Sequence, residues 1–271
     1  MKKILFIIFA STILFAGCSK KQNEQKNEKS EVVISALTDG SAVISGGTEK
    51  STAKVIASTS WTAAFADLAG VDDVEIIAPA SLRHPPEYEI TVSDIEKISN
   101  CDVFIYAGFE RMMKTLGDSV GDVNMMKVSC NNAISNVSAQ VAKIANEMGT
   151  SDISEERLMV YINTINEGKM QLESKGLAGA KVFCNANQIY LAKDLGLDIA
   201  ATFGPGEVTS EQIKQAKDEG FAFIIDNVHN PVAAPLAEVS NAKYVIWRNF
   251  PERVERDALT HVVAENIKQL F

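Results

Sequence analysis

The stretch that decides the fold is residues 53–107, AKVIASTSWTAAFADLAGVDDVEIIAPASLRHPPEYEITVSDIEKISNCDVFIYA. Three short apolar runs rich in Val, Ile and aromatic residues are typical of strands: 53–58, 73–78 and 101–107. A helix is predicted over 60–70, and Ser93 with Glu96 predicts a capping box that begins a second helix. Strands that alternate with helices in this way predict a parallel sheet covered on both faces.

The same alternation returns nearer the C-terminus, after a long helical interval. Helices are predicted over 132–148 and 154–174, with no strand between them. Strands then follow at 181–184, 199–203, 221–225 and 244–247, and helices at 188–195, 210–220 and 255–270. We therefore predict an α/β protein of two αβ lobes with parallel sheets, joined by a long connecting helix. The predicted boundaries are 53–131 for the N-terminal lobe, 132–176 for the connecting helices and 177–271 for the C-terminal lobe.

The first residues predict export to the cell envelope. Two lysines precede an apolar run over 4–15, which is too short to span a bilayer and suits a signal peptide over 1–17. The residues before Cys18 resemble the lipobox of bacterial lipoproteins, which implies a lipid anchor on Cys18; the alternative is an ordinary signal peptide with an incidental cysteine. Residues 18–31 carry almost only polar side chains and predict a disordered linker, and 32–52 predict a β-rich extension.

Charge and cysteine content exclude several classes of function. The formal net charge of −9 argues against nucleic-acid binding, which needs clustered lysine and arginine, and is compatible with a cationic cargo. Beyond Cys18 the cysteines are Cys101, Cys130 and Cys184, an odd number without a CxxC motif, so neither a disulfide framework nor a structural zinc site is indicated. The sequence also offers no nucleophile, base and acid in a catalytic order, and we predict that the protein is not an enzyme.

Two of the three histidines follow predicted strands of opposite lobes. His84 lies in a proline-bracketed loop, and His229 follows the run FAFII, whereas His261 lies inside the last predicted helix. Ligands of parallel sheets bind beyond the carboxyl ends of the strands, so His84 and His229 are expected to face one interlobe cleft. Asp226, three residues before His229, and Asn185, after the run KVFC, are expected to join them around a metal ion. Local hydrogen bonding by His84 and a strand-end turn at Asp226 are the alternatives.

Three further residues are candidates for ligand contacts in the same cleft: Glu87, Arg248 and Asn249. An arginine opposes a bare dication but favours an anion or a chelated metal. Arg248 is therefore compatible with a second kind of cargo, an anion or a chelated metal.

Several stretches, in this order, resemble one family: KVIAS at 54–58, EITVSDI at 89–95, CDVFIYAG at 101–108, Asn132-Ala133 and FIIDN at 223–227. Together with the N-terminal segment, they resemble the zinc- and manganese-receptor lipoproteins of ABC importers, the TroA-like family. The resemblance implies a chelatase-like fold, a monomer, and a divalent transition metal (Zn, Mn or Fe) carried as cargo. It also implies delivery to a membrane permease and its ATPase, by binding without turnover.

The family usually supplies three histidines and one carboxylate, or two of each, and this chain departs from that set. His84 matches the first histidine, the second falls near Met125 or Met126, and the third falls at Asn185. The last carboxylate falls near Arg248 and Asn249, while Asp226 keeps an acidic position. The alternatives are a receptor for an anionic or chelated ligand and a surface adhesion lipoprotein that keeps the fold without metal.

Overall fold

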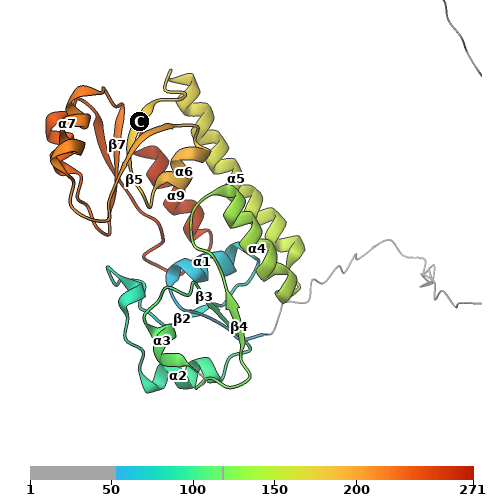
Figure 1. Cartoon of the computed structure of the whole chain (residues 1–271). Coiled ribbons are helices and arrows are strands. Elements are labelled where there is room, and N and C mark those ends of the chain that lie inside the picture. The colour runs from blue at the N-terminus through green and yellow to red at the C-terminus, as the bar shows by residue number, and fades with distance from the viewer. Residues whose placement is uncertain (1–52, 118) are drawn as a thin grey trace, which may run out of the picture. The chain divides into compact units, whose positions relative to one another are not determined.

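The computed structural model describes residues 53–117 and 119–271. The predicted signal peptide, the lipidated Cys18, the linker and the β-rich extension lie outside the described residues. Two four-stranded parallel sheets form the core of the described part, one in each lobe (Figure 1). The prediction of two αβ lobes with parallel sheets is therefore confirmed.

In each sheet, the strand that comes first in the sequence lies between two strands that come later in the sequence. The N-terminal sheet has the order β2-β1-β3-β4 and the C-terminal sheet the order β6-β5-β7-β8. Their bounds are β1 Val55–Ala57, β2 Glu75–Ile76, β3 Val103–Tyr106, β4 Asn124–Lys127, β5 Lys181–Asn185, β6 Asp198–Phe203, β7 Phe223–Asn227 and β8 Lys243–Trp247. The chain order reverses at the inner strand of each sheet, where a ligand crevice is expected in open parallel sheets.

Helices cover the sheets and connect the lobes. Their bounds are α1 Ser60–Leu68, η1 (a 3₁₀ turn) Pro85–Glu87, α2 Val92–Ser99, α3 Met112–Leu116, α4 Ile134–Met148, α5 Ser151–Ser174, α6 Ile189–Asp194, α7 Ser210–Asp218, α8 Ala234–Val239 and α9 Ala258–Lys268. The 24-residue α5 lies along one side of the molecule beside α4 (Figure 1). None of the helices within the described residues is long and apolar enough to cross a membrane.

One apolar core runs through both lobes by way of the connecting helix. It joins Phe65 of α1 to Tyr161 and Ile165 of α5, and continues to Trp247 in the C-terminal sheet. Gly168 lets α5 and α9 pack closely, because a Cβ atom there would lie 2.8 Å from Cγ2 of Ile267. A shared core of this kind resists large independent movements of the lobes.

The start of α2 differs from its prediction. Thr91, rather than Ser93, is the N-cap, and Asp94, rather than Glu96, completes the capping box. Thr91 Oγ1 accepts the amide of Asp94, while the Asp94 carboxylate accepts the Thr91 amide at 2.9 Å and the Tyr88 hydroxyl at 2.9 Å. Both residue pairs have the capping-box spacing, and the added Tyr88 contact favours the earlier start.

Replacing Thr91 with alanine is therefore expected to lower the free energy of unfolding by about 1 kcal/mol, because the cap bond to Asp94 is lost. Ser93→Ala is the matched control, since Ser93 is exposed inside the helix, and it should change stability by less than about 0.5 kcal/mol. Urea denaturation followed by circular dichroism compares the two. Equal effects of both substitutions would contradict the assigned cap.

Candidate functional site

Loops that follow the strands of the two sheets meet at the junction between the lobes. Ser60, just after β1, donates its hydroxyl to the Pro251 carbonyl at 2.6 Å. Asn132, just before α4, donates its side-chain amide to the Asn249 carbonyl at 2.8 Å. The strand-end loops of the N-terminal lobe thus contact the segment after β8 directly, as the topology predicts for parallel sheets.

His229 lies in this junction and is held from the opposite lobe. Its backbone carbonyl accepts Nε of Arg83 at 3.2 Å, and its ring Nδ1 lies 3.1 Å from the Arg83 carbonyl oxygen. The imidazole also stacks on Phe250, with ring centroids 4.1 Å apart. Because a carbonyl oxygen only accepts, the contact to Arg83 places the ring proton on Nδ1 and leaves a lone pair on Nε2.

The second ring nitrogen of His229 lies in a buried environment. Nε2 is buried and unpaired among the described residues. Burial lowers the pKa of His229 to about 4, the charges of Arg248 and His84 act in the same direction, and the Arg83 carbonyl opposes them. The imidazole is therefore neutral at neutral pH, with a lone pair in a dry environment. A metal-binding histidine typically has this state, with its other ring N–H donated to a carbonyl.

His84 comes from the other lobe to the same neighbourhood. It is exposed and begins the 3₁₀ turn η1, next to Arg83. Its chain neighbour Arg83 contacts His229 through both its guanidinium and its backbone carbonyl, so the loop that carries His84 adjoins the loop that carries His229. Glu87, at the end of η1, is exposed as well. The structure thus places the loops of both histidines at the lobe junction, and a shared site for the two imidazoles stays a prediction.

Asp226 lies inside the C-terminal lobe instead of in a loop. It belongs to β7, is fully buried, and pairs in register with Ile246. One carboxylate oxygen accepts the amide of Asn227 at 2.7 Å, and the other accepts the amide of Ala233 at 2.7 Å and the hydroxyl of Tyr244 at 2.8 Å. Because β7 continues two residues beyond its predicted end, the side chain points into the lobe and its oxygens are already occupied.

Asn185 is buried beside Asp226. Its Nδ2 lies 3.5 Å from the Asp226 carboxylate, and its Oδ1 accepts the amide of Asn187 at 3.0 Å. Burial, together with the hydrogen bond to Asp226, raises the pKa of the Tyr244 hydroxyl, so Tyr244 stays a donor to the carboxylate. Asn185, Asp226 and Tyr244 therefore form a polar cluster that supports the loop carrying His229.

Arg248 and Asn249 are also bound within the C-terminal lobe. The guanidinium of Arg248 pairs with Glu252 at 2.7 Å. The side-chain oxygen of Asn249 accepts Nδ2 of Asn227 at 3.1 Å and the side-chain amide of Gln188. Asn249 thus orders the loops after β7 and β8 relative to each other.

Sequence reasoning missed several residues of the junction. Arg83 and Phe250 hold His229, and Trp61 lies against Phe250, with ring centroids 5.5 Å apart. Asn132 is buried, and its Oδ1 has no partner among the described residues. The position of Phe250 just after the strand β8 is a signal for the junction, but an aromatic side chain does not by itself indicate a ligand site.

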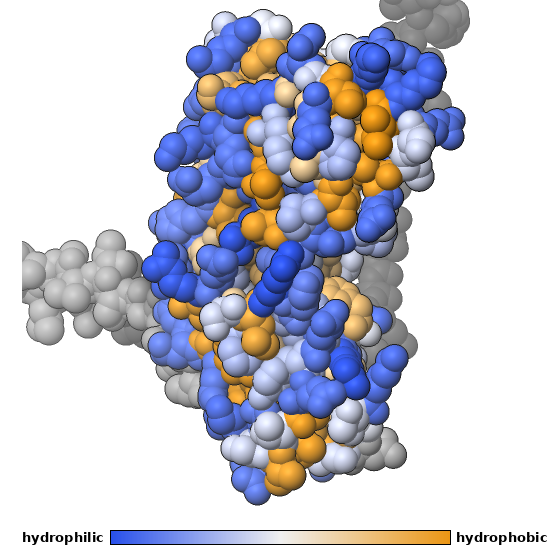
Figure 2. Space-filling model, turned by 90° about the vertical axis from the view of Figure 1, so that its left-hand side faces the viewer, coloured by the Kyte–Doolittle hydropathy of each residue, from blue (hydrophilic) through white to orange (hydrophobic). Residues whose placement is uncertain are grey.

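The junction does not present a complete set of metal ligands from protein side chains. Within the described residues, no three or more His, Cys, Asp or Glu side chains are grouped so that they could hold a metal ion. A metal here would have two imidazoles from the protein and would need carbonyl oxygens, water or a chelator for the remaining positions. Figure 2 shows one face of the molecule, on which hydrophilic residues predominate and hydrophobic residues lie among them.

Comparison with known proteins shows the fold. No family model matches the sequence, and no curated protein sequence matches it. Among solved structures, the solute-binding protein FpvC of Pseudomonas aeruginosa in complex with Ni²⁺ has a TM-score of 0.62 and 17% identity, over 80% of this chain and 95% of that one. The laminin-binding protein Lmb of Streptococcus agalactiae, described as having adhesin and metal-transporting activity, has a TM-score of 0.62 and 17% identity over 81% and 100%.

A third similar structure is the periplasmic metal-binding protein of Candidatus Liberibacter asiaticus, with a TM-score of 0.60 and 16% identity, over 81% of this chain and 100% of that one. Since the identities are low, these comparisons concern the fold. The resemblance to receptors of the TroA-like type is confirmed at that level.

Proposed function

We propose that this chain is a solute-binding protein of the cell envelope that takes a transition-metal ion at the interlobe junction and delivers it to an ABC importer. The single observation that supports a metal cargo is Nε2 of His229, which is buried and has no partner within the part of the chain that the structure describes. The contact from Nδ1 to the Arg83 carbonyl fixes its lone pair. The fold shared with FpvC and Lmb supports a binding role. A permease and its ATPase are the proposed partners, and Cys18 is the proposed membrane anchor.

His229 and His84 are the proposed protein ligands. Imidazole suits Zn²⁺ and Fe²⁺ and accepts Mn²⁺ more weakly, so these three ions are the proposed cargo. Asp226 and Asn185, expected from the sequence as ligands, are proposed to hold the His229 loop in place, because their polar atoms already bind within the lobe. Glu87 adds a carboxylate on the same turn as His84.

Calorimetric titration of the purified full chain with Zn²⁺, Mn²⁺ and Fe²⁺, the last without oxygen, tests the proposal. His229→Ala is expected to weaken binding about 10–100-fold, since one of two protein ligands is lost. His261→Ala is the matched control, because this histidine is exposed on α9, and it should bind like the unaltered chain. The absence of heat with all three ions would contradict a metal cargo.

An anionic or chelated cargo is the second candidate, favoured by one observation. The charge of Arg248 lowers the pKa of His229, so a guanidinium lies close to the same site and would oppose a bare dication. Citrate and its Fe³⁺ complex are suitable probes. Binding that is lost in Arg248→Ala and kept in His84→Ala would favour this candidate over the metal ion.

A further inference from the structure

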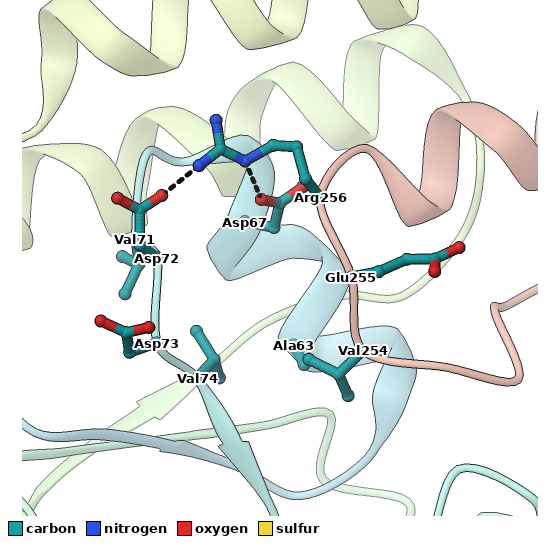
Figure 3. A pocket seen from close by; sticks show the side chains of 9 residues that line it. All are labelled: Ala63, Asp67, Val71, Asp72, Asp73, Val74, Val254, Glu255 and Arg256. Atoms are coloured by element: carbon teal, nitrogen blue, oxygen red, sulfur yellow. Dashed lines mark hydrogen bonds and ion pairs between the residues drawn. The ribbon is translucent and has the colours of Figure 1, made fainter.

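An ion network at the lobe junction links three parts of the chain. Asp67 lies in the last turn of α1, Asp72 follows that helix, and Arg256 comes from the loop before α9 (Figure 3). Arg157 comes from α5. Arg157 lies 3.2 Å from the Asp67 carboxylate and 2.6 Å from that of Asp72. Arg256 lies 3.2 Å from Asp67 and also pairs with Asp72. The same two carboxylates are thus shared by two arginines.

The two arginines have different environments. The Arg157 side chain is 8% exposed and also donates to the Asp67 backbone carbonyl at 2.6 Å, whereas the Arg256 side chain is 54% exposed. Exposed ion pairs are weak and are screened by salt, and buried ones are screened much less. Arg157 is therefore the buried partner of the two carboxylates, and Arg256 is the exposed partner, whose pairs are screened more by salt.

The residue after Arg256 adds a second observation. Asp257 has a φ of 58°, in the left-handed region that a non-glycine residue seldom adopts. Its backbone amide donates to the second oxygen of Asp67 at 2.8 Å. The contact with the opposite lobe therefore stabilises a strained backbone position, which could relax when that contact is broken.

A pocket lies beside the contact of this loop with α1. It has a volume of about 310 Å³ and is lined by Ala63, Val74, Val254 and the charged residues of the network (Figure 3). The side chain of Val254 is itself exposed. The polar contacts of Arg256 and Asp257 with Asp67 and Asp72 attach this part of the loop to the N-terminal lobe, while Ser60 and Trp61 hold the preceding residues Pro251 and Phe250.

We propose that Arg256 is an interlobe latch. Its pairing with Asp67 and Asp72 holds the loop over 254–257 on α1, and its release lets this loop leave α1 at the edge of the junction while the shared core stays packed. The latch goes beyond the proposed function, because it depends on contacts between the lobes and on no particular cargo.

Hydrogen exchange of the full chain without added metal tests the latch, so the result does not depend on whether a metal binds. Arg256→Gln is expected to speed exchange of the amides of 254–260 about ten-fold, because several weak contacts are lost together. Arg253→Gln is the matched control. The Arg253 side chain is 79% exposed, and its Nε lies 3.9 Å from the Glu255 carboxylate, which is a long distance for an ion pair. It should leave exchange unchanged.

A salt series adds a test on the unaltered chain. Raising NaCl from about 0.05 M to about 1 M should speed exchange of the same amides in the unaltered chain, since exposed pairs are screened. The effect should be smaller in Arg256→Gln, which has already lost the pairs. Equal exchange in the two glutamine variants, or exchange independent of salt in the unaltered chain, would overturn the proposal.

Discussion

Replacing Asp226 with alanine is expected to lower the free energy of unfolding by about 3–5 kcal/mol, a larger effect than on any exposed carboxylate of the chain. The carboxylate is fully buried and accepts from the amides of Asn227 and Ala233 and from the hydroxyl of Tyr244. Alanine would leave these donors buried without partners, and each such donor costs about 1–3 kcal/mol. Urea denaturation of the purified variant measures the loss.

Two controls separate this structural role from a role as a metal ligand. Asp198→Ala removes an exposed carboxylate from the first residue of β6 and should change stability by less than about 0.5 kcal/mol. Tyr244→Phe removes one of the donors to Asp226 and should cost less than Asp226→Ala. An Asp226→Ala variant that keeps full stability but loses metal binding would show that the carboxylate is a ligand instead.

The fold could be predicted because its signals are local. Strand β5 was predicted over 181–184 and is found at Lys181–Asn185, since a short apolar run bounded by polar residues indicates a buried strand. Strand β4 was missed because its sequence, NMMK, has no β-branched residue and alternates only weakly. The short helices α3 and α8 were missed because each is too brief to show a helical period.

The candidate site was harder to predict, since its contacts are not local. His229 and Arg83 are 146 positions apart, and their contact depends on how the lobes pack. The role of Asp226 depended on where β7 ends: a shift of one or two residues decides whether a side chain leaves the sheet edge or points into the lobe. The ends of helices and strands are the part of a structure that sequence predicts least well, so the ligands of a site at strand ends are also hard to predict.

Lowering the pH from about 6.5 to about 4 is expected to remove on the order of 2–3 kcal/mol of the stability that His229 contributes. The folded pKa of about 4 lies below the ordinary value of 6.5, chiefly because the ring is buried. In this window the unfolded chain binds a proton that the folded chain does not bind. The contribution of His229 is therefore complete above pH 6.5 and falls as the pH approaches 4.

His229→Phe isolates this contribution, because phenylalanine keeps a ring against Phe250 but cannot titrate. The difference in unfolding free energy between the unaltered chain and this variant should shrink or reverse toward pH 4, whereas His261→Phe should change the pH profile little because His261 is exposed. Parallel profiles for the unaltered chain and His229→Phe would contradict the burial of a neutral imidazole. Because a neutral His229 offers the same lone pair that a metal requires, such a result would also remove the physical basis for placing the cargo at Nε2.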